Sequence, residues 1–251
     1  MEEILEMSGV VTVIQARTNA SRLPGKVLLP LGHTTVLEQV IRRVQAAGIG
    51  GSVVVAVPEG EEDNVLRQQC AHLGIPCFSG SESDVLQRIL DTAYAYDAHI
   101  VVRCQANNPL LDPKMLWASA RYAYDSGMDY VTVARLPIGV ACEAFPVRTL
   151  ERIAELTNEP IYREQVTNFT CLRPDLFERA HLPPPTRLSR PDLRLTLETE
   201  ADYWFLKRIY EEVAPDSNGL LPIDDVLACI DTNLELRRHS PDSYAVVRKA
   251  A

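Results

Sequence analysis

The chain has 251 residues, ample for one large buried core, and its 46% hydrophobic and 24% charged residues are those of an ordinary globular protein. Its formal net charge of −9 argues against a general nucleic-acid binder, because phosphate backbones favour a basic protein face. No apolar run is long enough to span a membrane, and segment 1–8 is acidic with no apolar signal core. We expect a cytoplasmic protein with no nucleic-acid or membrane partner.

Strand-like and helix-like segments alternate through the first half of the chain. The expected strands are Val10–Ile14, Val53–Val57, Pro76–Phe78 and Ile100–Cys104. Apolar residues at helical spacing predict helices over Thr35–Ala47, Glu61–Leu73, Asp84–Ala98 and Pro113–Gly127. This succession of βα units predicts an α/β fold with a mostly parallel sheet covered on both faces.

The rhythm changes in the second half. Strands are expected at Tyr130–Ala134, Val140–Phe145 and Leu193–Leu197, and prolines make Leu182–Pro185 an irregular loop. Helices are expected over Arg148–Leu156, Glu159–Asn168, Thr199–Val213 and Pro222–Arg237. No repeat or linker divides the chain, so we expect one domain over 9–240, an N-terminal extension over 1–8 and a C-terminal tail over 241–251.

The six cysteines form no Cys-x-x-Cys pair and no zinc-binding spacing. Several stand among apolar residues, where a thiol behaves as a small core side chain. We therefore expect reduced thiols without a catalytic role at Cys70, Cys77, Cys104, Cys142, Cys171 and Cys229.

A basic loop follows the first expected strand. It carries Arg17, Arg22 and Lys26 within ten residues, with Ser21 and backbone amides between them. Guanidinium groups bind phosphate oxygens bidentately and a lysine adds a point charge, so the loop suits a polyphosphate. A solvated basic loop is the alternative interpretation.

Two other phosphate-binding devices are excluded by spacing. A P-loop needs glycine where Ala20 stands and Ser or Thr where Val27 stands. The dinucleotide-binding fingerprint follows the first strand, whereas Gly48-Ile49-Gly50-Gly51 precedes a strand.

The run Gln15-Ala16-Arg17 followed by Ser21-Arg22-Leu23-Pro24-Gly25-Lys26 resembles the signature of the cytidylyltransferase family that includes the CMP-Kdo and CMP-acylneuraminate synthetases. It is most similar to the branch named for spore coat polysaccharide biosynthesis protein F. The resemblance covers roughly residues 9–240 and implies a three-layer αβα nucleotide-diphospho-sugar transferase-like fold. It also implies that the loop wraps the CTP triphosphate, with Arg17, Arg22 and Lys26 as catalytic cations. The implied nucleotide ligands in this segment are Gln15, Ala16, Arg17, Ser21 and Lys26.

A second segment follows the expected strand Pro76–Phe78. Gly80 allows a base or ribose to approach the backbone, and Ser81 and Asp84 can hydrogen-bond to sugar or base. The alternative is that a serine here caps the following helix. The stretch also resembles the family's Gly-Ser-x-x-Asp-Val-Leu-x-Arg element, which implies nucleotide recognition by Gly80, Ser81, Asp84 and Arg88.

The metal positions depart from the family's pattern. Asn107 stands where the family has the first aspartate that holds Mg²⁺, and it is also an implied nucleotide ligand; Glu198 replaces the second aspartate. An amide oxygen can bind Mg²⁺ but brings no charge. The substitutions are compatible with a weakened metal site, an altered acceptor geometry or loss of activity, and we expect an altered but active enzyme that uses Mg²⁺.

The resemblance implies acceptor-binding roles for Glu143, Arg163, Glu164 and Arg194. The alternative is that Arg163 and Glu164 form an exposed helix ion pair of little energetic value. Arg194 lies within an expected strand, and a buried arginine needs a partner such as an anionic substrate. Two aspartates of the family pattern are missing beside these arginines, so a phosphate, phosphonate or carboxylate acceptor is expected.

These observations predict a CTP-dependent cytidylyltransferase, in which an acceptor oxygen attacks the α-phosphorus of CTP and pyrophosphate leaves. An anionic acceptor would need no general base. One alternative is a nucleotide-binding protein without turnover that acts with a pathway partner, and another is a nucleotidyltransferase that uses UTP or GTP. A homodimer is expected from the resemblance alone.

Overall fold

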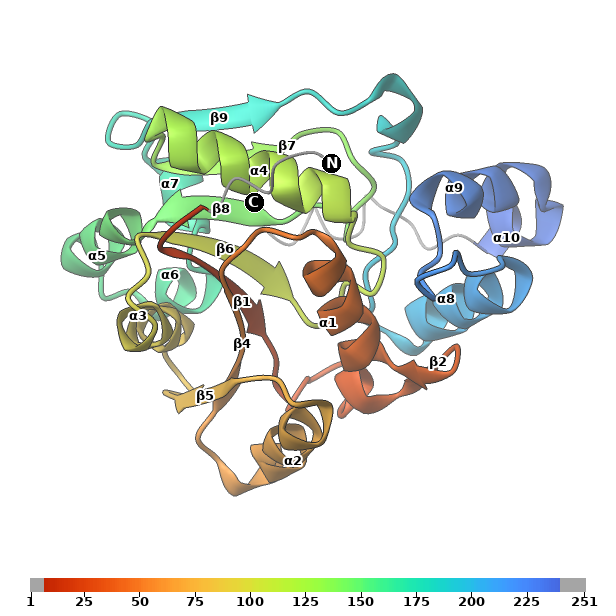
Figure 1. Cartoon of the computed structure of the whole chain (residues 1–251), viewed down its shortest axis with the longest axis horizontal. Coiled ribbons are helices and arrows are strands. Elements are labelled where there is room, and N and C mark those ends of the chain that lie inside the picture. Colours follow the sequence, from red (N-terminus) through yellow and green to blue (C-terminus); the bar gives the residue numbers. More distant parts are fainter. Residues whose placement is uncertain (1–6, 240–251) are drawn as a thin grey trace.

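The structure is a computed structural model that describes residues 7–239. The expected tail over 241–251 and most of the expected extension over 1–8 therefore lie outside the described residues. The chain forms a sheet with helices on both faces, and a small group of helices lies beside the sheet (Figure 1).

Seven strands form the main sheet, in the order β5-β4-β1-β6-β8-β7-β9. The strands are β1 (Val10–Gln15), β4 (Ser52–Pro58), β5 (Cys77–Gly80), β6 (Ile100–Gln105), β7 (Tyr130–Val133), β8 (Glu143–Pro146) and β9 (Arg179–Leu182). Strands β5, β4, β1 and β6 are mutually parallel, and β7 is parallel to β9. Only β8 runs antiparallel to its neighbours, so the expected mostly parallel sheet is confirmed.

The side chains of β1 point alternately to the two faces of the sheet, so they belong to two separate layers of the core. Val10 and Ile14 pack on the face that is covered by α1 (Val36–Ala46), α2 (Asn64–Leu73) and α4 (Pro113–Ser126). Val11 and Val13 pack on the opposite face, under α3 (Val85–Ala95) and α5 (Val147–Leu156). The expected three-layer αβα arrangement is thus present.

A third apolar cluster lies at the end of the sheet where α8 (Glu200–Glu212), α9 (Ile223–Thr232) and α10 (Leu234–His239) gather, drawn in blue in Figure 1. A short hairpin of β2 (Pro30–Leu31) and β3 (Thr34–Thr35) follows the basic loop, and its Leu31 is buried in this cluster. A single-turn helix, η3 (Thr186–Leu188), adds Leu188 to it, and two further turns lie at η1 (Lys26–Leu28) and η2 (Glu61–Asp63).

The expected strand Leu193–Leu197 is wrong. Its leucines alternate because they are buried in the cluster around α8, but the segment joins no named strand and makes only the isolated bridge Ile138↔Arg194. The edge strand is instead β9, which the sequence analysis missed. It is short and only partly buried, so it carries no clear strand pattern.

Two expected helices are interrupted. In place of one helix over Glu159–Asn168, α6 (Pro160–Gln165) and α7 (Asn168–Leu172) are separated by Val166, which is fully buried with a φ of 54°. A positive φ is costly for a β-branched residue, so packing rather than local preference sets this turn. The expected helix Pro222–Arg237 is divided at Asn233 into α9 and α10.

None of the helices in the described part of the chain is both long enough and apolar enough to cross a bilayer.

Candidate active site

The basic loop between β1 and η1 is held in a defined shape. The buried carboxylate of Asp63 accepts hydrogen bonds from the Thr18 backbone nitrogen at 2.7 Å and from the Thr18 hydroxyl at 2.9 Å. The Gly25 nitrogen donates to the Thr18 carbonyl at 2.8 Å, and Gly25 adopts a φ of 70° that favours glycine. The loop is therefore preformed.

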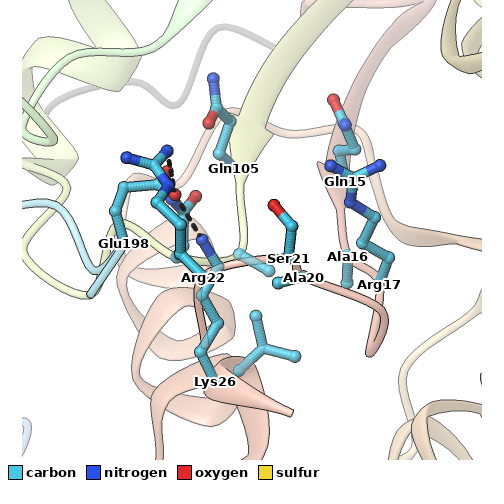
Figure 2. A pocket seen from close by; sticks show the side chains of 12 residues that line it. Gln15, Ala16, Arg17, Ala20, Ser21, Arg22, Lys26, Gln105 and Glu198 are labelled. Atoms are coloured by element: carbon cyan, nitrogen blue, oxygen red, sulfur yellow. Dashed lines mark hydrogen bonds and ion pairs between the residues drawn. The ribbon is translucent and has the colours of Figure 1, made fainter. Parts of the chain in front are cut away.

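A hollow opens at the carboxyl ends of β1 and β6, and we call it the phosphate pocket (Figure 2). Eight of the residues predicted from sequence line it: Gln15, Ala16, Arg17, Ser21, Arg22, Lys26, Asn107 and Glu198. The remaining lining residues are Ala20, Val27, Gln105 and Ala106. The structure thus brings together the loop cations and both predicted metal positions.

Glu198 is the central anion of the phosphate pocket. Its carboxylate accepts from Lys26 Nζ at 2.8 Å, Arg22 Nη2 at 3.0 Å and Asn107 Nδ2 at 2.6 Å. Figure 2 shows the first two contacts as dashed lines. Burial lowers the pKa of Lys26, and the hydrogen bond to Glu198 only partly opposes this effect. Lys26 is therefore a partly desolvated cation, the kind that binds an incoming anion strongly.

The turn that carries Glu198 is held in place by the side chain of Asp202. Asp202 accepts from the Glu198 nitrogen at 2.9 Å and the Thr199 nitrogen at 2.7 Å, and it forms a two-pronged pair with Arg194 at 2.8 and 2.9 Å. The side chains of Arg194 and Asp202 are only 5% and 2% exposed. Burial raises the pKa of Asp202, but the hydrogen bonds and the positive charge of Arg194 outweigh burial. The pKa of Asp202 therefore lies below its ordinary value.

The donor set suits a magnesium ion only in part. Within residues 7–239, no three His, Cys, Asp or Glu side chains gather into a metal-binding group, and Glu198 is the one carboxylate that lines the phosphate pocket. Mg²⁺ is commonly bound through one or two carboxylates together with substrate phosphates and water. The residues therefore fit an ion that arrives on a triphosphate rather than a resident one.

The segment after β5 caps α3, but the capping residue is Asp84, so the alternative interpretation that a serine caps this helix is wrong. Ser81 Oγ accepts from the Asp84 nitrogen at 3.1 Å, and Asp84 accepts from the Gln87 nitrogen at 2.9 Å. Ser81 also lines a second hollow with Arg17 and Pro58, which joins the loops after β1, β4 and β5. Nucleotide recognition by Gly80, Ser81, Asp84 and Arg88 remains a prediction.

Arg88 does not line that second hollow and is fully buried. Its Nη1 donates to the Ser81 carbonyl, while Nε and Nη2 have no partner among the described residues. Burial, reinforced by the charge of Arg17, lowers the pKa of Arg88 to about 10. A Cβ added at Gly80 would lie 3.1 Å from Arg88 Cγ, so Arg88 would have to shift by a few tenths of an ångström to accept it.

A further hollow shares Gln15 and Gln105 with the phosphate pocket, and we call it the acceptor pocket after the predicted acceptor residues Glu143 and Glu164 that line it. Its lining residues are Gln15, Arg103, Gln105, Tyr130, Glu143, Glu164, Gln165, Thr167, Asn168 and Cys171. Glu143 accepts from Arg103 Nη1 at 2.6 Å, from the Tyr130 hydroxyl at 3.0 Å and from the Thr167 hydroxyl at 2.6 Å. Burial and the neighbouring Glu143 carboxylate raise the pKa of Tyr130, so its hydroxyl stays a donor.

The predicted acceptor residues do not gather in one place. Glu143 and Glu164 line the acceptor pocket, and Glu164 also contacts Arg17 at 3.3 Å. Arg163 is directed instead to Asp84, with Nε 2.7 Å from the carboxylate. Arg194 is paired with Asp202 below the phosphate pocket. The interpretation of Arg163 and Glu164 as one helix ion pair is wrong, because each has a distant partner.

Three residues of the site were missed. Asp63 holds the loop through Thr18, Arg103 holds Glu143 and Gln15, and Gln105 lines both pockets. Arg103 left a signal, because a charged residue inside the apolar run Ile100–Cys104 needs a polar partner. Asp63 and Gln105 left none.

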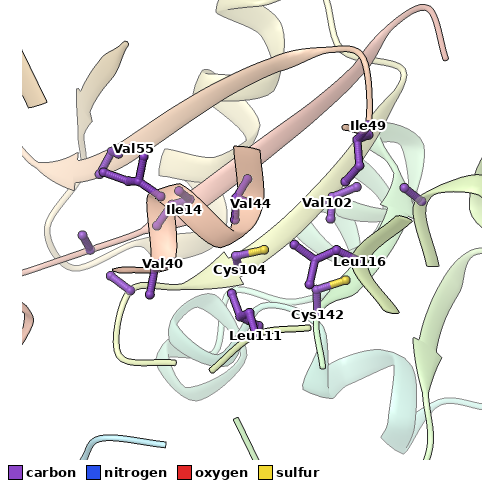
Figure 3. Close-up of a cluster of buried hydrophobic side chains, with 14 of the residues drawn as sticks. Ile14, Val40, Val44, Ile49, Val55, Val102, Cys104, Leu111, Leu116 and Cys142 are labelled. Atoms are coloured by element: carbon purple, nitrogen blue, oxygen red, sulfur yellow. The ribbon is translucent and has the colours of Figure 1, made fainter. Parts of the chain in front are cut away.

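Most cysteines lie away from the site. Cys104 and Cys142 belong to the core beneath α4, as Figure 3 shows, and burial raises the pKa of both thiols. They are small core residues, as expected. Cys171 is exposed and lines the acceptor pocket.

An αβα fold whose strand ends present three loop cations and a carboxylate defines a nucleotidyltransferase. The family model described as cytidylyltransferase matches residues 11–213, and the chain belongs to this family. The spore coat polysaccharide biosynthesis protein SpsF of Bacillus subtilis is 32% identical over 211 residues, which are 82% of this chain and 88% of SpsF. The predicted resemblance is thereby confirmed.

Two further relatives agree. A 3-deoxy-manno-octulosonate cytidylyltransferase of Sodalis glossinidius is 28% identical over 159 residues, 62% of each chain. The solved structure of a cytidylyltransferase from Leptospira borgpetersenii superposes with a TM-score of 0.83 at 28% identity, covering 91% of this chain and 96% of that one.

Proposed function

We propose that the protein transfers CMP from CTP to a small-molecule acceptor and releases pyrophosphate. A lone pair of the acceptor oxygen forms a bond to the α-phosphorus, the bond from the α-phosphorus to the bridging oxygen breaks, and its electron pair leaves with pyrophosphate. The observation that carries the proposal is the convergence of Arg17, Arg22 and Lys26 on one pocket at the strand ends. Such fixed cations stabilise the charge that develops on a leaving pyrophosphate.

In this proposal the free protein keeps its cations paired until CTP binds. Lys26 and Arg22 exchange Glu198 for phosphate oxygens, and Arg17, which is 43% exposed, turns to the triphosphate. Glu198, fixed in place by Asp202 through its backbone, becomes available as a carboxylate ligand for magnesium. When bound, Mg²⁺ would be held by Glu198 and would supply positive charge that offsets the charge of the phosphates.

The test measures CTP affinity by calorimetry and pyrophosphate release with Mg²⁺ and a panel of acceptors. The triple variant Arg17→Gln/Arg22→Gln/Lys26→Met should abolish both, whereas Lys114→Met, an exposed position outside the phosphate pocket, should change neither. A wild-type protein that binds no CTP would contradict the proposal. Thermal-shift comparison of the four triphosphates tests base choice, for which CTP should give the largest shift.

The second candidate is a nucleotide-binding protein without turnover. It is favoured by the amide at Asn107, which leaves Glu198 as the single carboxylate lining the phosphate pocket within the described residues. Tight CTP binding that ignores Mg²⁺, and that Asn107→Asp does not make Mg²⁺-dependent, would support this candidate over the enzyme.

The proposed acceptor needs revision in one respect. The expectation of an anionic acceptor was based on arginines without internal partners, yet Arg163 pairs with Asp84 and Arg194 with Asp202. This part of the charge argument is lost, whereas the absence of the two family aspartates still stands, so the charge of the acceptor remains a prediction. A homodimer stays a prediction, which light scattering on the purified protein would test.

A further inference from the structure

Gln15 is the last residue of β1, and it lines both the phosphate pocket and the acceptor pocket, as Gln105 also does. In the proposed function the acceptor oxygen comes from the acceptor pocket, and the leaving pyrophosphate lies in the phosphate pocket. The α-phosphorus is bonded to both in the transition state, so it must lie at the wall that the two pockets share. A side chain of this wall is therefore in position to contact the α-phosphate.

A row of polar side chains crosses three neighbouring strands beside Gln15. Side chains alternate along a strand, so Gln15 projects from the same face of the sheet as Val13, two residues before it. Arg103 of β6 is in register with Val13, and Glu143 of β8 is in register with Arg103. Gln15, Arg103 and Glu143 therefore occupy neighbouring positions on one face of the sheet.

Arg103 fixes the orientation of the Gln15 amide. Its Nε and Nη2 donate to Gln15 Oε1 at 3.1 and 2.8 Å, and Arg103 is only 7% exposed. Rotation of the amide by 180° would bring its NH2 group against these two N–H donors, so the amide oxygen must face Arg103. The guanidinium is itself held, because Nη1 donates to Glu143 at 2.6 Å, and Glu143 also accepts from the hydroxyls of Tyr130 and Thr167.

The nitrogen of the Gln15 amide is available to a ligand. Within residues 7–239, Gln15 Nε2 has no hydrogen-bond partner, and the side chain is half-buried. Since Oε1 is occupied by Arg103, the group that Gln15 can offer at the shared wall is an N–H donor. A positive charge at the oxygen end polarises an amide and strengthens donation from its nitrogen.

Gln105 differs from Gln15 in this respect. It is exposed, and its side-chain amide makes no hydrogen bond within the described part of the chain. Nothing in that part of the chain fixes which end of the Gln105 amide is directed to a ligand. Gln15 is thus the preorganised donor of the wall.

On the basis of the proposed function, we propose that Gln15 is a catalytic residue whose Nε2 donates a hydrogen bond to a non-bridging oxygen of the CTP α-phosphate, and that Arg103 is the positioning residue that fixes this donor. The charge of a transferred phosphoryl group is spread over its equatorial oxygens, and a fixed donor stabilises it. Arg22 and Lys26, which Figure 2 shows across the phosphate pocket from Gln15, serve the leaving pyrophosphate.

A nucleotide series locates the contact without an acceptor. Dissociation constants are measured at one Mg²⁺ concentration, by calorimetry for CTP and CDP and by NMR titration for CMP and cytidine. Gln15→Met keeps the length of the side chain but has no N–H donor. We expect it to weaken CMP, CDP and CTP by a similar factor of about tenfold, since each carries the α-phosphate. Cytidine lacks this phosphate, and its affinity should be unchanged.

A second variant guards against a folding defect. Gln15→Glu keeps an oxygen for Arg103 but places a carboxylate oxygen where the donor was, so it should weaken the three phosphorylated ligands at least as much and leave cytidine unchanged. Gln68→Met, at an exposed position on α2, is the matched control and should change none of the four affinities.

The positioning role of Arg103 is tested by non-additivity. Arg103→Met should give the same pattern over the four ligands with a smaller fall, because the amide is still present but no longer held. Arg103→Lys, which can donate to Oε1 again, should restore part of the affinity. Gln15→Met/Arg103→Met should bind CMP no more weakly than Gln15→Met, since Arg103 acts through Gln15. Additive losses would overturn the positioning role.

Each other pattern overturns the assignment of Gln15. A fall for cytidine as well would place Gln15 at the base or ribose, and a fall for CDP and CTP alone would place it at the outer phosphates. Affinities that Gln15→Met leaves unchanged for all four ligands would exclude a nucleotide contact while the proposed function stands. Failure of the proposed function is seen separately, as absence of CTP binding to the wild-type protein, and would overturn both.

Discussion

The phosphate pocket and the acceptor pocket lie side by side but differ in how their charges are paired. In the first, Arg17, Arg22 and Lys26 face the single carboxylate of Glu198, so cations are in excess. In the second, Arg103 is the one cation among the described lining residues and faces Glu143, while the other carboxylate, Glu164, pairs with Arg17 of the first pocket at 3.3 Å. The difference shows that a count of arginines along a chain does not locate free positive charge, because the fold decides which arginines have internal partners.

The largest effect is expected from Asp202→Asn, which removes the internal partner of Arg194 and leaves a buried unpaired cation. We expect the free energy of unfolding to fall by about 3–5 kcal/mol, because one partner of a buried pair is removed. Urea denaturation measures the loss. Asp192→Asn, whose carboxylate is 56% exposed beside Arg190, should cost under about 0.5 kcal/mol.

The same pair predicts a pH dependence. Because the pKa of Asp202 is lowered in the folded protein, its contribution to stability is complete above the unfolded value of about 3.9 and is lost as the pH falls through the folded value. The wild-type protein should therefore lose more stability below about pH 4 than Asp202→Asn does. Equal acid slopes in the two proteins would contradict this.

Lys26→Met removes a cation from the phosphate pocket while leaving the acceptor pocket intact. We expect kcat for pyrophosphate release to fall by about 10²–10³, the usual effect of losing one fixed donor to developing charge. Acceptor KM should change little, which separates the two regions kinetically. An unchanged kcat would remove Lys26 from the proposed catalytic set.

The protonation of Lys26 tests the charge of the phosphate pocket in the unmutated protein. Its pKa lies below 10.5 in the free protein, and a bound triphosphate should raise it, so CTP binding takes up a proton in that alkaline window. CTP affinity should fall by up to about tenfold per pH unit as the pH rises through the lowered pKa. Lys26→Arg should abolish this fall, since arginine stays charged. Calorimetry in buffers of different ionisation enthalpy measures the proton uptake.

The smallest expected effect concerns the shape of the basic loop. Thr18→Val removes one hydroxyl bond to the buried Asp63, at about 1 kcal/mol, so CTP affinity should weaken roughly fivefold. Thr232→Val, whose hydroxyl donates to the Ala228 carbonyl on α9, is the matched control and should leave CTP affinity unchanged.

Where the sequence analysis succeeded, local pattern and topology agreed. Continuous apolar runs predicted β1, β4 and β6, and the family resemblance implied that Lys26 and Asn107 serve one site, which the structure places at the carboxyl ends of the parallel strands β1 and β6. The sequence analysis failed where an irregular buried segment had the alternating pattern of a strand. Leu193, Leu195 and Leu197 alternate because they pack in the cluster around α8.

Pairings across long stretches of sequence were also out of reach. Arg163 of α6 pairs with Asp84 at the start of α3, and Glu164 of α6 pairs with Arg17 of the basic loop; only the packing of α6 beside both segments brings these partners together. Arg194 and Asp202 are eight residues apart, but the wrong strand assignment concealed that the turn before α8 returns one to the other. Charge compensation is a tertiary property, which explains why the acceptor was harder to predict than the nucleotide.

Glu198 acts as a resident counter-ion, since it holds Lys26 and Arg22 in position before any substrate arrives. It offsets the repulsion between these two like charges, while the hydrogen bonds of Thr18 hold the backbone of the loop. An anion that binds here must therefore compete with the Glu198 carboxylate for Lys26 and Arg22. A single phosphate or sulfate competes less well than a chain of phosphates, which carries more charge. If CTP binds here as proposed, the same carboxylate favours a polyphosphate over a single phosphate group.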